Sequence, residues 1–215
     1  MSQSRVLVAA AIGAGVLYVV GFAALGSPPE ATDSPREVAD WFVEHRDGAR
    51  IYAWSATFGT LAFAVFAALV REALPVVCGR VFLIGALAFI VETAVQAWFW
   101  AGLSLHPHSL DPETARTLLD VASFWGPLLT GATMVMIGAV TVLGLRAEPL
   151  IPRWLTVLGI VAFVEQAVET VTVFGTEGFA APGGDWNILL GAGITSVFLI
   201  GLVVWAAGRL APRPA

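Results

Sequence analysis

The chain has 215 residues, of which 58% are hydrophobic and only 13% are charged, and its mean hydropathy is strongly positive. This composition excludes an ordinary soluble domain and is typical of an integral membrane protein. The net charge of −5 comes without any basic tract, which argues against nucleic acid as a partner. The single cysteine, Cys78, excludes an internal disulfide framework.

Six apolar segments are long enough to cross a lipid bilayer. A helix needs about 20 apolar residues to span the hydrocarbon core, and backbone groups that lipid cannot hydrate must be satisfied within a helix. The predicted spans cover roughly residues 5–25, 50–70, 81–104, 122–145, 153–174 and 186–208. The sequence therefore predicts one integral membrane domain over residues 1–215, folded as an all-α, polytopic transmembrane bundle in the lipid bilayer.

The arginines predict the orientation of the bundle. All basic residues are arginine, a usage typical of a high-GC bacterial genome, so we expect the membrane to be the bacterial inner membrane. Basic residues are concentrated in the short loops on the cytoplasmic side. The larger group of arginines lies near the two termini and in the loops on their side: Arg5, Arg71, Arg80, Arg146, Arg153, Arg209 and Arg213. We therefore expect both termini in the cytoplasm.

The one long connection, residues 26–49, contains the start signals of a further helix. Ser34 can cap the helix, Pro35 suits its first position, and Glu37 completes a capping box. An apolar stripe at helical spacing follows, formed by Val38, Trp41 and Phe42. We expect a short amphipathic helix over about residues 35–47, lying on the outer membrane surface or over the mouth of the bundle.

Two short segments indicate an internal repeat. Residues 91–96 read VETAVQ and residues 164–169 read VEQAVE, and a proline-containing loop between two arginines precedes each segment. The second and third spans therefore look like a duplicate of the fourth and fifth spans. Hairpins two spans apart share their orientation, so the repeat is expected to be parallel.

Three glutamates fall inside the predicted spans, although a charged side chain at the centre of a span costs about 2.5–3.5 kcal/mol. Counted along the helices, Glu92 and Glu165 lie near the bilayer midplane, and Gln96 and Glu169 lie one turn further out. Lipid offers these groups no partner, so we expect the two polar stripes to meet in the core of the bundle or around a water-filled cavity. Because burial and like charge both oppose ionisation, at least one of these glutamates is expected to be protonated at pH 7.

Three functions remain open for this carboxylate site. The first is the binding or transport of a small cationic or protonatable ligand at Glu92, Glu165 and Glu169. The second is a membrane-embedded isomerase or terpene-cyclase-like enzyme, in which a protonated glutamate is the general acid acting on a lipophilic substrate. The third is a structural membrane protein with a buried polar network. The residues expected to contact a ligand or substrate are Gln96, Trp100, Gln166, Trp54, Trp98 and Trp125.

Access distinguishes these functions. A transporter needs a water path or gated access from the aqueous faces, an enzyme for lipophilic substrates needs a lateral opening to lipid, and a structural protein needs neither. No cofactor is expected, because no histidine falls inside a span to hold haem and the sequence contains no phosphate-binding loop or zinc spacing. The spacing of His106, His108 and Asp111 is compatible with a metal, but Pro107 and the loop setting favour a solvated turn.

Three features together give the chain its resemblance to a known group. The first is the N-terminal span that begins with an arginine, and the second is the glutamates in the third and fifth spans. The third is the outer proline-rich loop that runs into Pro35-Arg36-Glu37-Val38-Ala39-Asp40-Trp41-Phe42. The pattern resembles small polytopic membrane proteins of high-GC actinobacterial type. The resemblance covers most of the chain and implies the topology only, with no activity and no oligomeric state.

Overall fold

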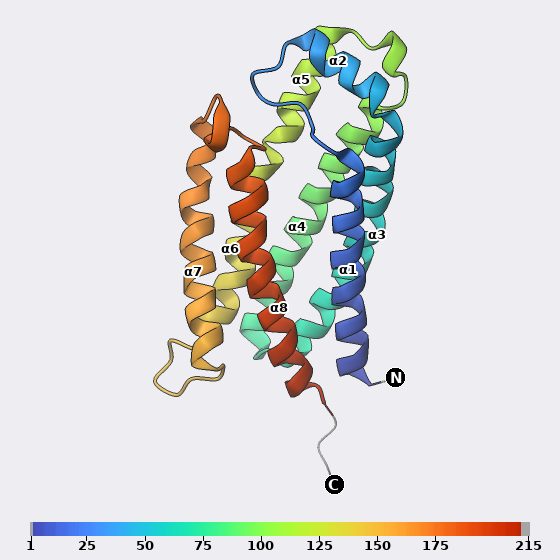
Figure 1. Ribbon diagram of the computed structural model, residues 1–215. Coiled ribbons are helices and arrows are strands. Elements are labelled where there is room, and N and C mark those ends of the chain that lie inside the picture. Colours follow the sequence, from blue (N-terminus) through green and yellow to red (C-terminus); the bar gives the residue numbers. More distant parts are fainter. Residues whose placement is uncertain (1, 212–215) are drawn as a thin grey trace.

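The computed structural model describes residues 2–211, and in this range the chain forms helices and no strand (Figure 1). The long helices are α1 (Gln3–Leu25), α2 (Pro35–Glu44), α3 (Arg46–Ala73), α4 (Val76–Leu103), α5 (Pro112–Ser123), α6 (Trp125–Thr141), α7 (Arg153–Glu169) and α8 (Ala192–Arg209). Shorter turns are η1 (Pro107–Ser109), η2 (Thr170–Phe174), η3 (Gly178–Ala180) and the π-helical η4 (Trp186–Gly191). Six stretches are long and apolar enough to cross a membrane, with α5 continuing into α6, α7 into η2 and η4 into α8. The prediction of a six-span, all-α bundle is confirmed.

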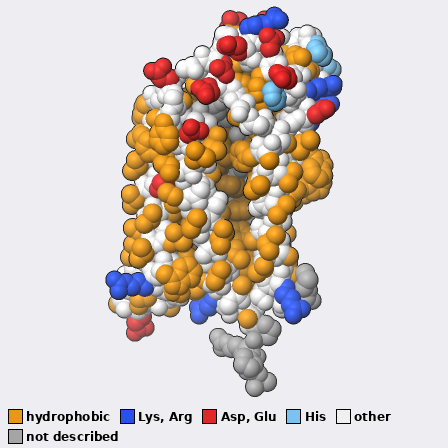
Figure 2. All heavy atoms as spheres, viewed as in Figure 1, with side chains coloured by type: hydrophobic (Ala, Val, Ile, Leu, Met, Phe, Trp, Pro, Cys, Tyr) orange, Lys and Arg blue, Asp and Glu red, His pale blue; other side chains and the backbone are white. Residues whose placement is uncertain are grey.

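The six spans form a ring. α1 packs on α3, α3 on α4, α4 on α6 and α6 on α7, and α8 closes the ring between α7 and α1. Figure 1 shows the start of α1 and the end of α8 at one end of the bundle, here named the terminal end, and α2 at the other, here named the α2 end. Arg213 lies outside the described residues. The other arginines of its group flank the terminal end, and Figure 2 shows acidic side chains gathered at the α2 end.

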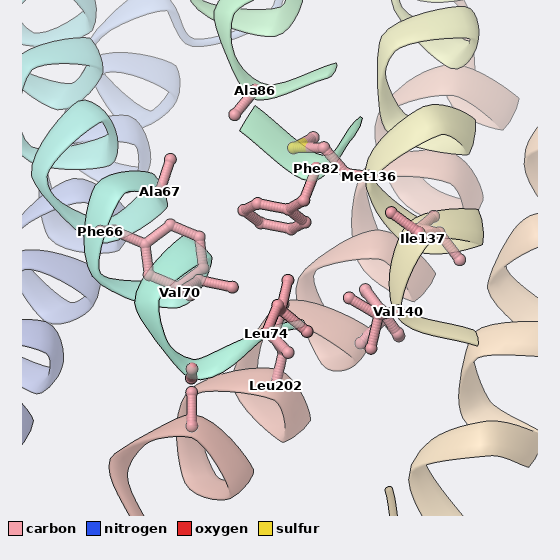
Figure 3. Close-up of a cluster of buried hydrophobic side chains, with 14 of the residues drawn as sticks. Phe66, Ala67, Val70, Leu74, Phe82, Ala86, Met136, Ile137, Val140 and Leu202 are labelled. Carbon is pink, nitrogen blue, oxygen red and sulfur yellow. The ribbon is translucent and has the colours of Figure 1, made fainter. Parts of the chain in front are cut away.

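The half of the ring near the terminal end is filled by apolar side chains. Figure 3 shows this cluster, in which Phe66 of α3 and Phe82 of α4 meet edge to face with ring centroids 6.5 Å apart. Met136 and Ile137 of α6 and Leu202 of α8 complete it, and all of these side chains are fully buried. Such close packing leaves no room for a polar site in this half.

Small residues let the helices approach closely. A Cβ atom at Gly85 of α4 would lie 2.8 Å from the carbonyl oxygen of Ala132 in α6, and one at Gly159 of α7 would collide with the side chain of Thr141 in α6. Small residues play this role at helix contacts in membranes, where association depends on van der Waals packing. These positions fix α6 between α4 and α7.

The amphipathic helix lies over the mouth of the bundle. Ser34 and Glu37 form the predicted capping box: the Ser34 side chain accepts from the Glu37 N–H, and the Glu37 carboxylate accepts from the Ser34 N–H at 2.7 Å. The apolar face of α2 packs on α5, η1 and α3, with Val38 and Phe42 fully buried. α2 ends at Glu44 and α3 begins at Arg46, so the second span starts earlier than the sequence predicted.

The fourth span is divided at Phe124, where α5 ends and α6 begins. Pro127 explains the break, because it has no N–H to donate to the Ser123 carbonyl and its ring crowds that group. The division lies in the half of the span nearest the α2 end, as the position of Pro127 predicts.

Candidate functional site

The intramembrane glutamates lie in two separate groups, because α6 packs between α4 and α7. Glu92 belongs to α4, whereas Glu165 and Glu169 belong to α7. Among the hydrogen bonds of residues 2–211, none joins Glu92 to either glutamate of α7. The two polar stripes therefore form separate hydrogen-bonded groups among the described residues. In this ring each helix packs on its neighbours, and the sequence does not reveal that order.

The α7 group is a closed hydrogen-bond network. The Gln166 side-chain amide donates to Glu165 Oε2 at 2.9 Å and to Glu169 Oε2 at 2.6 Å. Asn187 Nδ2 donates to Glu169 Oε1 at 2.6 Å, and Trp186 Nε1 donates to Glu165 Oε1 at 3.1 Å. Each of the four carboxylate oxygens therefore accepts one hydrogen bond from an amide or indole N–H.

Further contacts satisfy the amides themselves. The Thr133 hydroxyl of α6 donates to Gln166 Oε1, and the Gly183 N–H donates to Asn187 Oδ1 at 2.9 Å. The second hydrogen of Asn187 Nδ2 points to Thr172 Oγ1 at 3.2 Å. Since this network joins α6, α7, η2 and η4 and leaves no carboxylate oxygen free, it can hold these elements together without a ligand.

Two glycines and a π-helical turn make room for the network. A Cβ atom at Gly191 would collide with the Glu169 carboxylate, and one at Gly126 would lie 2.7 Å from the side chain of Asn187. Asn187 itself is carried by η4, and single π-helical turns often occur at functional sites. Sequence reasoning missed Asn187, Thr133 and these glycines. The one available signal was that Asn187 is the only asparagine of the chain and falls inside a span.

The α4 group is not closed. The Tyr52 hydroxyl of α3 donates to Gln96 Oε1, but Glu92 Oε2 is buried with no hydrogen-bond partner among the described residues. The hydroxyls of Tyr18 and Thr93 lie beside each other, yet neither forms a hydrogen bond of normal geometry. The buried, unpartnered atoms of the spans, apart from Arg46 at the start of α3, are Tyr18 OH, Glu92 Oε2, Thr93 Oγ1, Trp100 Nε1, Trp125 Nε1 and Thr195 Oγ1.

Several of these atoms lie at one depth in the bundle. At about 1.5 Å of rise per residue, Tyr18 of α1, Glu92 of α4 and Thr195 of α8 are about 21–24 Å from the ends of their helices at the terminal end. Thr93 follows Glu92 by one residue. Three of the six spans therefore carry unpartnered polar atoms at a similar distance from the terminal ends of their helices.

The predicted tryptophans divide between the interior and the surface. Trp54 and Trp98 are 59% and 71% exposed, so they face the surroundings of the bundle and not the glutamates. Such tryptophans are typical of the aromatic belt of membrane proteins. Trp100 is buried, with its ring centroid 5.8 Å from that of Tyr52, and Trp125 keeps a buried indole N–H. Of these four tryptophans, only Trp100 and Trp125 have a buried indole N–H.

The chain has no match among known protein families, curated proteins or solved structures. The contrast between the two groups therefore carries the functional conclusion. The carboxylate oxygens of Glu165 and Glu169 accept hydrogen bonds from neighbouring side chains. Oε2 of Glu92 is buried and has no donor, so a ligand can donate to it.

Proposed function

We propose that this integral membrane protein binds a small cationic or protonatable ligand, with Glu92 as the group that accepts it. The supporting observation is that Glu92 Oε2 is buried without a partner. A buried polar atom left unpaired costs about 1–3 kcal/mol, and lipid cannot supply the missing partner. A ligand that donates an N–H to this oxygen offsets that cost, and a positive charge on the ligand strengthens the hydrogen bond.

Other buried polar and aromatic side chains of the bundle suit the same ligand. The hydroxyls of Tyr18, Thr93 and Thr195 can each donate and accept, so they can orient a ligand that carries more than one polar group. The indole rings of Trp100 and Trp125 attract positive charge through their faces. The acidic side chains at the α2 end, seen in Figure 2, attract cations to the membrane surface at that end.

The proposal assigns a different role to the glutamates of α7. Glu165 and Glu169 hold α7 to α6 and η4 through the closed network, which is the structural function considered from the sequence. Ligand binding is therefore proposed for Glu92 and not for all three glutamates.

The orientation of the bundle belongs to the same proposal. Described arginines near the terminal end are Arg5, Arg71, Arg80, Arg146, Arg153 and Arg209. Under the positive-inside rule this end is cytoplasmic. We therefore place the protein in the bacterial inner membrane with both termini in the cytoplasm and the α2 end outside.

Calorimetric titration of the protein in lipid nanodiscs tests the ligand. The probes are phenethylamine, which is small and protonatable, and phenethyl alcohol, which has the same shape without the amine. We expect saturable binding of the amine, at least about tenfold weaker binding of the alcohol, and a similar loss for Glu92→Gln, corresponding to about 1.4 kcal/mol or more.

Glu165→Gln is the matched control, since it makes the same change at a similar depth on another helix. It is expected to change the thermal stability and to leave the amine affinity close to that of the wild type. Absence of saturable amine binding by the wild type, or equal binding by the wild type and Glu92→Gln, would contradict the proposal.

A further inference from the structure

α1 and α8 pack against each other in the half of the bundle near the terminal end. There Leu7 and Ala14 of α1 and Leu202 and Ala206 of α8 belong to the buried apolar cluster. Figure 1 shows the two helices diverging toward the α2 end, with α4 behind the gap, and Figure 2 shows the surface hollowed between them. The ring is therefore open on one side in the half that holds the unpartnered polar atoms.

On the α8 side of the opening, the packing of the helix ends near Ser196. Ser196, Leu199 and Val203 follow one another at the spacing of a single helix face. Leu199 and Val203 pack against the buried cluster, whereas Ser196 is exposed. The packing on this face of α8 therefore ends between Leu199 and Ser196.

The α1 side of the opening begins at the same level. Gly15 and Ser196 lie about 18–20 Å from the ends of their helices at the terminal end, at about 1.5 Å per residue. A Cβ atom added to Gly15 would have no atom outside its own helix within 4 Å. Further toward the α2 end, Phe22 of α1 and Leu189 of η4 are both exposed. The exposed surface of α1 and η4 above this level therefore includes large apolar side chains.

Access from the water at the α2 end is covered. Phe42 of α2 is fully buried, with its ring centroid 5.6 Å from that of Trp100. Arg116 of α5 donates to the carbonyl oxygen of Glu30 at 2.8 Å and to that of Asp33 at 3.3 Å, which holds the loop before α2 in place. α2 and the loop before it are therefore held over this end of the bundle.

We infer that the ligand reaches Glu92 sideways from the lipid, between α1 and α8, in the half of the bilayer next to the α2 end. The inference rests on the proposed function and specifies its ligand class: a lipid-soluble amine with an apolar tail. The amine passes Ser196 toward Tyr18, Thr195 and Glu92, and the tail stays between the apolar walls. An enzyme for lipophilic substrates needs the same lateral access, but the unpartnered Oε2 of Glu92, which can accept a hydrogen bond from an amine, favours binding.

Photolabelling in nanodiscs tests the route without relying on amine binding. A lipid-soluble alkyl diazirine inserts into side chains that lipid-dissolved molecules reach, and mass spectrometry locates them. We expect label on Tyr18 and Thr195 in the wild type and its loss in Ser196→Phe, which fills the opening. Val197→Phe is the matched control, because Val197 is the next residue, is exposed, and lies on the lipid-facing side of α8. It is expected to keep the label.

Labelling of exposed positions such as Val197 with none on Tyr18 or Thr195 overturns the lateral route. Persistence of the label on these two residues in correctly folded Ser196→Phe overturns it as well. The association rate of octylamine, recorded by stopped-flow tryptophan emission, is the second measurement: we expect Ser196→Phe to slow it and Val197→Phe to leave it unchanged. If the label reaches Tyr18 but Glu92→Gln binds amines like the wild type, the route stands and the proposed role of Glu92 fails.

Discussion

Glu169 illustrates at the residue scale how far a sequence can define a buried site. Its position inside an apolar segment identifies it as exceptional, because a carboxylate there needs partners. One partner, Gln166, is three residues away on the same helix. The other, Asn187, lies in the π-helical turn η4, beyond η2 and the loop that contains η3, so no helical spacing predicts the contact. The same limit applies to Glu92, whose lack of a partner depends on which helices surround α4.

Gly191 provides a test of the closed network. A methyl group there would collide with the Glu169 carboxylate and push it away from Asn187 and Gln166. We expect Gly191→Ala to destabilise the protein by about 1–3 kcal/mol, the cost of leaving a buried hydrogen-bonding group unpaired. The thermal unfolding midpoint in detergent measures the effect.

Gly193→Ala is the matched control, two residues further along α8. No atom outside its helix lies within 4 Å of the added Cβ, so only the helix propensity changes, by about 1 kcal/mol in favour of alanine. The midpoint is therefore expected to stay the same or to rise slightly. Equal effects of the two alanines would show that Gly191 does not support the network.

At the scale of single elements, the sequence defines boundaries better than contacts. The capping box of Ser34 and Glu37 marks the start of α2, and Pro127 accounts for the break between α5 and α6. Both signals act within four residues of the chain. The packing of α2 against α5 has no such local signal, since Phe42 and Ala115 are far apart in the sequence and meet only in the fold.

Acid is expected to loosen α2. The Ser34 N–H holds the pKa of Glu37 below its ordinary value by donating to the ionised carboxylate. A lowered pKa in the folded state means that the stabilisation is present above the unfolded pKa of about 4.3 and is lost as the pH falls through the folded value. Hydrogen exchange of residues 36–44 between pH 6 and pH 3, corrected for the intrinsic rate, should show protection falling below about pH 4.

Glu37→Gln isolates this effect, because glutamine does not ionise. The variant should show weaker protection of α2 at pH 6 and less change on acidification than the wild type. The N–H and hydroxyl of Thr114 also lower the pKa of Asp111. Asp111 is present in both the wild type and Glu37→Gln, so it contributes the same pH dependence to each. If the two proteins lose protection in parallel, other carboxylates are responsible.

At the scale of the whole molecule, the chain forms a ring whose two ends differ in charge. The number of spans and the depth of the glutamates follow from segment length and hydropathy, so both were predictable. The order of helices around the ring was not, because all six spans are similarly apolar and several faces could pack. The parallel repeat of the second and third spans with the fourth and fifth stays a prediction. The two glutamates that it relates have different surroundings: Oε2 of Glu92 has no hydrogen-bond partner, whereas both carboxylate oxygens of Glu165 accept a hydrogen bond.

Cysteine labelling tests the orientation of the ring. In a Cys78→Ala background, Glu177→Cys lies in the exposed loop before α8 and Glu148→Cys in the exposed loop between α6 and α7. A membrane-impermeant maleimide applied to intact bacteria should label the first and not the second, because the positive-inside rule places the α6–α7 loop in the cytoplasm. Permeabilised cells should label both. The opposite pattern would reverse the proposed orientation.

The π-helical turn η4 has a consequence for how this site arose. A π-helical turn contains one residue more than the α-helical turn that it replaces. Deleting one residue between Asn187 and Gly191 would restore a regular helix and rotate Asn187 by about 100° relative to α8, away from Glu169. Glu169 would then lose a donor that it needs inside the membrane. A single-codon insertion and an acidic residue at position 169 are therefore expected to occur together in the lineage of this protein, and shorter ancestors should carry an apolar residue at that position.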